Sequence, residues 1–142
     1  MAGCRASLQI LEQFFKTAGA GKTFSKFSGL VRPVYADNGH VKIEFDVTNE
    51  LTNEMGTLHG GCSATLIDIA TTAACMLTSK AAPGVSVNLD VNYMSAAKLG
   101  DTVVLEAKVL RIGNTLAYTE GTLFLKNSEK LVAKGMHTKA FP

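Results

Sequence analysis

The sequence lacks the features of several common protein classes. Its three cysteines are an odd number without a CxxC pair, so we expect neither a disulfide framework nor a zinc site or other metal. It has no Asn-x-Ser/Thr sequon and no continuous apolar signal segment, which argues against secretion. The net charge of +2 is small, whereas nucleic-acid binding usually needs a dense basic stripe. We therefore expect a protein of a reducing compartment with no nucleic-acid partner.

The sequence begins with a basic, amphipathic segment. Four basic residues and a single acid, Glu12, occur among residues 1–26, and apolar residues recur at helical spacing. We interpret residues 1–22 as a helix and connector that pack on the domain. A basic amphipathic start is also typical of a mitochondrial address, so we expect a cytoplasmic location, a mitochondrial one, or both.

Apolar spacing predicts one α+β domain over residues 1–142. From Val41 to Val47 every second residue is apolar, which is typical of a strand with one face in water. Pro33 marks the preceding strand as an edge strand, and Asp37-Asn38-Gly39 predicts the hairpin turn. The expected order is a helix at 5–18, strands at 28–36 and 40–48, a helix at 60–79, and strands at 85–93, 103–109, 114–126 and 130–140. Short turns between consecutive strands predict an antiparallel sheet.

The segment 60–79 is apolar on all sides and is expected to form a helix buried almost everywhere. A transmembrane span is the competing interpretation at this length. Its central charge, Asp68, and several hydroxyl side chains make insertion costly, so we expect no membrane span. A sheet can cover the helix on one side only, and a second copy of the chain is the simplest cover for the other side.

Gly60 and Gly61 lie where this helix is expected to begin. Backbone N–H groups at a helix N-terminus are unpaired and carry a partial positive charge, and glycine lets a ligand carbonyl approach them closely. This combination is typical of an oxyanion hole. Asp68 follows two turns later, and because an ionised carboxylate in apolar surroundings is costly, it is a candidate functional residue.

The spacing of these groups bears on how a site can be built. Gly60 and Asp68 are eight residues apart, so they lie ~12 Å apart along a helix. One helix can hardly place both on the same carbonyl, which predicts an active site shared between two chains. Ordinary structural interpretations stay open: Asp68 could pair with a basic residue of a strand, and His59 could cap the helix.

Six residues have a spacing that resembles a known signature. The spacing is Asn-x2-Gly-x2-His-Gly-Gly-x6-Asp, formed by Asn53, Gly56, His59, Gly60, Gly61 and Asp68. It is similar to the signature of hotdog-fold thioesterases of the phenylacetate-pathway and 4-hydroxybenzoyl-CoA type. The resemblance extends over nearly the whole chain and departs at Ala96, where the family usually has proline. It implies an antiparallel sheet wrapped around one long central helix, in a dimer or a dimer of dimers.

The resemblance also implies roles for single residues. Gly60 would donate its backbone N–H to a thioester carbonyl, and Asp68 would act as general base or nucleophile. Ser86, expected on the polar face of its strand, would position the attacking water, although alone it would be taken for a solvent-facing serine. Asn53 would hold the carbonyl or the water, and His59 would support the turn before the helix.

Coenzyme A needs a cationic, partly exposed surface for its phosphates. The resemblance suggests two segments for this purpose, Tyr93 to Lys98 and the turn from Arg111 to Thr115. Lys98 and Arg111 would be the phosphate partners. Together with Ser86, the implied substrate-binding residues are Tyr93, Met94, Ser95, Lys98, Arg111, Gly113, Asn114 and Thr115. No separate cofactor is implied, because coenzyme A is part of the substrate.

The preferred function is hydrolysis of fatty acyl-CoA, of medium to long chain, to the free acid and coenzyme A. One alternative is a hotdog enoyl-CoA hydratase or dehydratase, which usually needs a histidine with an acid in the active site. The other is a non-catalytic acyl-CoA or lipid binder, for which an uncharged residue at position 68 would be better suited.

Overall fold

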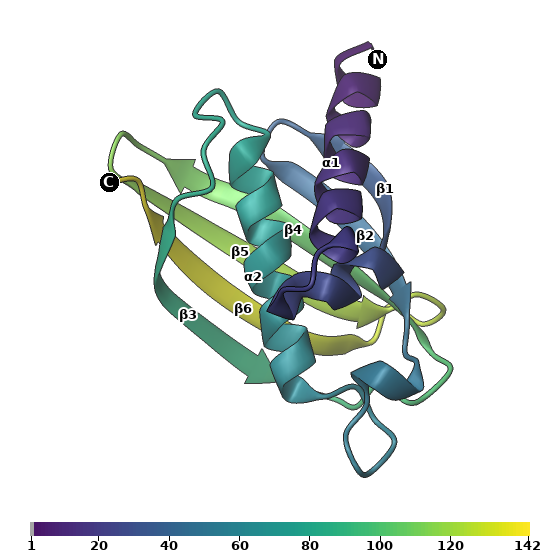
Figure 1. The fold of residues 1–142 in the computed structure, drawn as a ribbon. Helices are drawn as coiled ribbons and strands as arrows, with labels where there is room; N and C mark the ends of the chain where they lie inside the picture. The colour runs from purple at the N-terminus through teal and green to yellow at the C-terminus, as the bar shows by residue number, and fades with distance from the viewer. Residues whose placement is uncertain (1) are drawn as a thin grey trace.

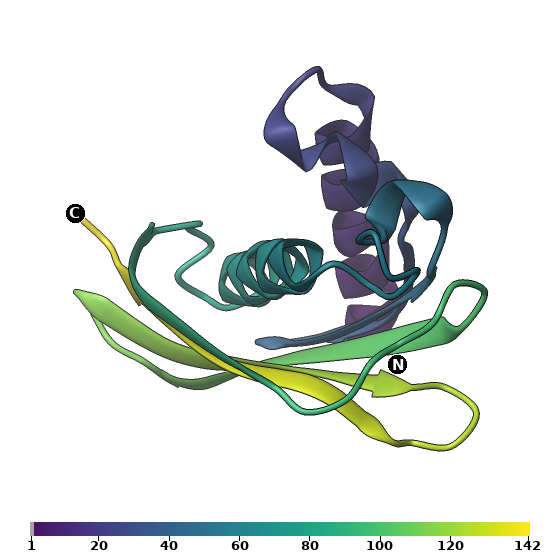
Figure 2. The same cartoon turned by 90° about the horizontal axis from the view of Figure 1, so that it is seen from below.

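A curved sheet with one long helix on its concave face dominates the computed structural model, which describes residues 2–142 (Figures 1 and 2). In chain order the elements are α1 (Ala2–Ala20), the 3-10 helix η1 (Phe24–Leu30), β1 (Arg32–Asp37), β2 (His40–Asp46), the 3-10 helix η2 (Asn49–Leu51), α2 (Gly60–Met76), β3 (Val85–Tyr93), β4 (Thr102–Ile112), β5 (Leu116–Leu125) and β6 (Leu131–Ala140). The six strands are ordered β1-β2-β4-β5-β6-β3, and every neighbouring pair is antiparallel. This arrangement confirms the expected α+β hotdog fold.

The first hairpin follows the sequence pattern closely. Val41, Ile43 and Phe45 of β2 are fully buried, whereas the residues between them are not. Gly39 closes the β1–β2 turn with φ +71°, a conformation that glycine adopts without strain. β1 is an edge strand that tolerates Pro33, as expected, but it begins at Arg32. The prediction of a strand from residue 28 was wrong, because residues 24–30 form η1 against α1 instead.

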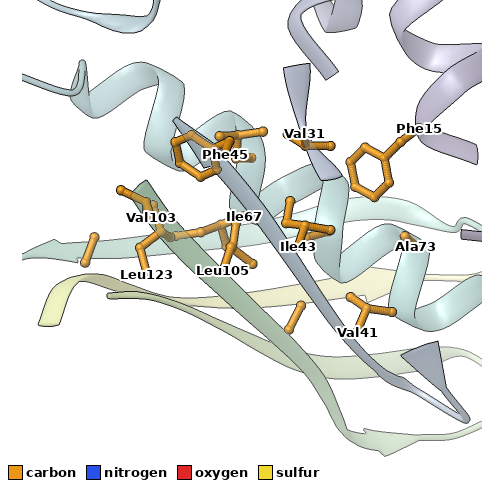
Figure 3. Packing of buried hydrophobic residues seen from close by; sticks show 14 of the residues in the cluster. Phe15, Val31, Val41, Ile43, Phe45, Ile67, Ala73, Val103, Leu105 and Leu123 are labelled. Atoms are coloured by element: carbon orange, nitrogen blue, oxygen red, sulfur yellow. The ribbon is translucent and has the colours of Figure 1, made fainter. Parts of the chain in front are cut away.

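Helix α2 lies close to the sheet because two glycines lie beneath it. A Cβ atom at Gly121 would come within 3.0 Å of Ile67 Cγ2, and one at Gly135 within 3.2 Å of Ile67 Cδ1. The two glycines are partners across β5 and β6. Figure 3 shows Ile67 among apolar side chains of the neighbouring strands, including Leu105 and Leu123. Larger side chains at these two positions would push the helix away from the sheet.

The opposite face of α2 is not covered by the described part of the chain. Gly61, Thr65, Asp68 and Thr72 recur at helical spacing along this face, and none of them is buried. As expected, the sheet reaches only one side of the helix, and the prediction that a second copy of the chain covers the other side stays a prediction. Neither helix within residues 2–142 has the length and apolarity needed to cross a bilayer.

Helix α1 packs beside β1 and fixes the position of η1. Leu11 and Phe15 are buried in the core, and Figure 3 shows Phe15 close to Val31. At the other end of α1 the backbones of Gly19 and Gly29 meet, since a Cβ at Gly19 would lie 2.4 Å from Gly29 Cα. This contact holds η1 against α1.

Gly19→Ala should destabilise the protein, because its new methyl group would collide with the backbone of Gly29. We expect a loss of about 1–3 kcal/mol in the free energy of unfolding, measured by urea denaturation. Gly3→Ala in the same helix is the control, since no atom lies within 4 Å of its added Cβ. Equal stability of the two variants would contradict the close contact.

Candidate active site

The start of α2 presents the backbone group expected for carbonyl binding. His59 caps the helix, with its Nδ1 accepting the Gly61 N–H at 2.9 Å. No hydrogen bond between described residues uses the Gly60 N–H. The Tyr93 hydroxyl donates to the Gly60 carbonyl at 2.8 Å, and a Cβ at Gly60 would meet the Tyr93 ring at 3.3 Å. Glycine at position 60 therefore leaves an available donor at a helix N-terminus, with an aromatic side chain packed beside it.

Asn53 holds the loop that leads to this helix. Its Oδ1 accepts the backbone N–H groups of Met55 and Thr57 at 3.0 and 3.2 Å, and its Nδ2 donates to Thr57 Oγ1 at 2.9 Å. Farther along, the His59 N–H donates to the Leu51 carbonyl at 2.8 Å. Asn53 thus acts on the position of Gly60 through the loop, and one N–H of its amide remains for a direct contact with substrate or water.

Asp68 lies on the open face of α2 with 44% of its side chain exposed. The sequence predicted a carboxylate in apolar surroundings; the structure corrects this, because the sheet covers only the other face of the helix. Within residues 2–142, no lysine or arginine forms an ion pair with Asp68. Its nearest ionisable partner is His137, whose Nε2 lies 3.9 Å from Asp68 Oδ1. Nearly half of this side chain is therefore exposed and available to a ligand.

His137 on β6 is fully buried and joins α2 to β3. Thr71 donates its single hydroxyl hydrogen to the Ile67 carbonyl at 2.8 Å, so its oxygen accepts the His137 Nδ1–H at 2.7 Å. Burial lowers the pKa of His137, the nearby Lys139 lowers it further, and Asp68 opposes them. The neutral ring then offers a lone pair at Nε2, which accepts the Ser86 hydroxyl at 2.8 Å. Ser86 keeps its own lone pairs for a further donor such as water.

Ser86 faces the helix, which corrects its expected place among the polar residues of its strand. The register of β3 against β6 shifts between Ser86 and Asn88, so one residue is inserted in the alternation there. Leu89 is the partner of the buried His137, and Ser86 beyond the bulge is the partner of Lys139. The bulge thus places the Ser86 hydroxyl beside Asp68 and His137 on the same chain.

His137 and Lys139 were not predicted from the sequence. Lys139 is almost completely buried, and its Nζ donates to Thr72 Oγ1 at 2.9 Å. Burial lowers the pKa of Lys139, against the opposing effects of Asp68 and Cys75. The signal was available in β6, where both residues share the parity of Ala133 and Gly135, which favours an inward position. Lys139 thus places a basic side chain at Thr72, one helical turn after Asp68.

The residues expected to bind coenzyme A fall into two groups in one chain. The segment from Tyr93 to Lys98 lies beside the start of α2, since the Leu58 N–H donates to the Ala97 carbonyl at 2.8 Å. The turn at 113–115 lies beyond the other end of α2, where Lys80 Nζ donates to the Asn114 carbonyl at 2.7 Å. Strand β4 separates Lys98 from Arg111, and its ten-residue rise is ~33 Å. A single chain does not bring these two groups together.

No metal site accompanies this cluster in the described part of the chain, where no three His, Cys, Asp or Glu side chains converge. The chemistry that the side chains themselves offer is that of a carboxylate beside a positioned hydroxyl. Such a pair can take a proton from water and hold that water in place.

Comparisons with known proteins agree with one another. Residues 55–132 match the family model described as the thioesterase superfamily. Human acyl-coenzyme A thioesterase 13 is 44% identical over 131 residues, which cover 92% of this chain and 94% of the human protein. The crystal structure of zebra fish thioesterase superfamily member 2 matches with a TM-score of 0.93 at 39% identity, covering 95% of this chain and 98% of that one. The mouse member 2 structure gives 0.84 at 37% identity, covering 92% and 96%.

The buried histidine should make folding sensitive to acid. Because the pKa of His137 is lower in the folded protein than its usual 6.5, the unfolded chain takes up the proton first. Its contribution to stability is therefore full above about pH 6.5 and is lost as the pH falls further. In thermal melts between pH 5 and pH 8, the melting temperature of His137→Gln should fall less at low pH than that of the wild type.

The matched control is His40→Gln, which changes a histidine outside the buried cluster, bonded to Glu106 at 2.9 Å. It should retain the acid sensitivity of the wild type. An identical pH dependence in His137→Gln and wild type would contradict the role given to His137.

Proposed function

Because this chain belongs to the thioesterase superfamily and is a thioester hydrolase, we propose that it converts fatty acyl-CoA of medium to long chain into free fatty acid and coenzyme A, in the cytoplasm, the mitochondrion or both. The activity named for its human relative supports this substrate class. The observation that carries the proposal is the cluster around Asp68, in which a half-exposed carboxylate lies beside a hydroxyl oriented by His137.

In the proposed reaction the thioester carbonyl lies against the Gly60 N–H at the start of α2. The developing negative charge on its oxygen is stabilised there by the N–H and the helix dipole, an interaction worth ~3 kcal/mol in comparable sites. Asp68 takes a proton from water as the water oxygen attacks the carbonyl carbon; the C–S bond then breaks, and coenzyme A leaves as a thiolate that takes up the proton from Asp68. If Asp68 attacks directly instead, the C–S bond breaks to give an acyl-aspartate anhydride, which water then hydrolyses. Ser86 accepts a hydrogen bond from the attacking water, and His137 holds Ser86 in place by accepting its hydroxyl hydrogen.

We infer that two chains complete each active site. β3 is the last strand of the sheet, and its outer edge is unpaired within residues 2–142 (Figure 1). Antiparallel pairing of two β3 strands across a two-fold axis would extend the sheet and bring the open faces of two antiparallel α2 helices together. Gly60 of one chain would then lie near Asp68 of the other.

The same pairing would join the two groups proposed for coenzyme A. It sets the Tyr93 end of one β3 beside the Val85 end of the other, where the turn at 113–115 lies. Lys98 of one chain and Arg111 of its partner would then be on one surface, suited to the phosphates of a single coenzyme A. Two such dimers would form the proposed tetramer.

The hydratase alternative needs a histidine that reaches the substrate. His137 is the histidine beside Asp68, but it is completely buried and both of its ring nitrogens are occupied by Thr71 and Ser86. It can orient Ser86 but cannot exchange protons with a bound acyl group, which favours hydrolysis.

Asp68→Asn should reduce turnover of acyl-CoA by ~10²- to 10⁴-fold, because the amide cannot act as a base. The melting temperature should stay close to the wild-type value, since no lysine or arginine within residues 2–142 forms an ion pair with Asp68 and the neighbouring His137 is neutral. Release of free thiol from acyl-CoA is the measurement. The control is Asp37→Asn, which changes an exposed carboxylate at the β1–β2 turn and should leave turnover intact. Full activity in Asp68→Asn would remove Asp68 from the mechanism.

Mixed dimers test the shared site. Asn53→Ala and Asp68→Ala should each be nearly inactive, because one disturbs the loop before Gly60 and the other removes the base. After co-refolding in equal amounts, half of the dimers are mixed and each has one intact site, so activity should recover to about a quarter of wild type.

The control mixture combines Asp68→Ala with Ser86→Ala. Both residues lie in the same half of the proposed site, so no mixed dimer has an intact one, and activity should not exceed the mean of the two parents. Recovery in both mixtures, or in neither despite proven mixed dimers, would argue against a site divided in this way.

A further inference from the structure

A pocket of about 440 Å³ opens beside the start of α2. Its walls come from three parts of the chain: η1, η2 and the first turns of α2. Phe24, Phe27, Leu51, Gly61, Cys62 and Thr65 are the lining residues on which the argument depends. The Phe24 and Phe27 rings meet edge to face, with centroids 6.0 Å apart, and form the outer wall. The volume lies in the range usual for small-molecule sites.

The pocket adjoins the start of α2, where the proposed carbonyl donor lies. Gly61 and Thr65 belong to the open face of α2 that also contains Asp68, and Gly61 directly follows the proposed carbonyl donor, Gly60. Tyr93, in the segment proposed for coenzyme A, packs against Gly60 but does not line this pocket. A carbonyl bound at Gly60 would therefore have two directions for its two substituents, one toward Tyr93 and one into the pocket.

The chemistry of the walls decides which substituent enters. Most of the exposed lining is apolar, and burial raises the pKa of the Cys62 thiol to about 11, so this side chain is uncharged at neutral pH. Among residues 2–142, no lysine or arginine lines the pocket, and its one acidic side chain there, Glu50, would repel a phosphate. The walls suit a hydrocarbon chain and oppose the nucleotide end of coenzyme A.

We propose that this pocket receives the acyl chain of the substrate, an inference that rests on the proposed thioesterase function. Phe24, Phe27 and Leu51 on one side and Cys62 and Thr65 on the other contact the chain. Lengthening the chain adds buried apolar surface until the pocket is filled, so these residues set the preference for chain length.

A second apolar pocket provides the internal control. It has about 480 Å³ and is lined by residues of α1, including Ile10 and Phe14, and by Met76. Met76 lies sixteen residues after Gly60, so this pocket is ~24 Å along the helix from the carbonyl donor of the same chain. None of its lining residues belongs to η1, η2 or the first turns of α2, so changes there should have no effect on chain-length preference.

The experiment compares kcat/KM for decanoyl-CoA and butanoyl-CoA. Phe24 is 78% exposed, so Phe24→Ala removes part of the wall without disturbing the core. Cys62→Leu is the second variant, which fills the pocket from its floor. Each should lower kcat/KM for decanoyl-CoA by about 10-fold and change that for butanoyl-CoA by less than about 2-fold. Ile10→Ala should change neither by more than about 2-fold, and melting temperatures confirm that all variants are folded.

The outcomes distinguish a failure of the pocket assignment from a failure of the proposed thioesterase function. Absence of turnover of both substrates by the wild-type protein would overturn the proposed thioesterase function, and this inference with it. Wild-type turnover with equal losses on both substrates in Phe24→Ala and Cys62→Leu would overturn the pocket assignment alone. The pocket assignment is also overturned if neither variant changes kcat/KM for either substrate. It is overturned as well if Ile10→Ala shifts the chain-length preference as strongly as Phe24→Ala.

Discussion

The close contact between Ile67 and the glycines beneath it determines the geometry of the rest of the molecule. Because Gly121 and Gly135 have no side chains, α2 lies directly on the sheet. At that distance Thr71 reaches His137 and Thr72 reaches Lys139, each with a hydrogen bond shorter than 3 Å. Asp68 lies on the same stretch of helix, so its position relative to His137 and Ser86 follows from how deeply the helix lies on the sheet.

A helix fixed in this way has two faces with different tasks. The face toward the sheet is packed with apolar side chains, whereas the other exposes Gly61, Thr65, Asp68 and Thr72. The sheet cannot cover the second face, since it curves around one side of the helix only (Figure 2). In the single chain, the one carboxylate of this apolar helix therefore lies on the open face and not in the core, where its ionisation would be costly.

Local patterns predicted much of this structure, and their failures have identifiable causes. The alternation of β2, the turn at Gly39 and the edge position of β1 depend on neighbouring residues, and all three were predictable. The direction of Ser86 was not, because the bulge in β3 reverses the alternation on which the prediction depended. His137 was missed because its hydrogen-bond partners come from α2 and β3, far away in the sequence, and no local pattern reports such partners.

The contact between Gly19 and Gly29 has a consequence for how related proteins can diverge. It fastens η1, with Phe24 and Phe27, to α1, whereas Asp68, His137 and Ser86 depend on α2 and the sheet. Exposed positions of η1, such as Phe24, can therefore change without disturbing the chemical groups, whereas Leu11 and Phe15 of α1 belong to the core. Gene duplicates that diverge at these exposed positions would keep the same carboxylate and differ in one wall of the pocket beside it.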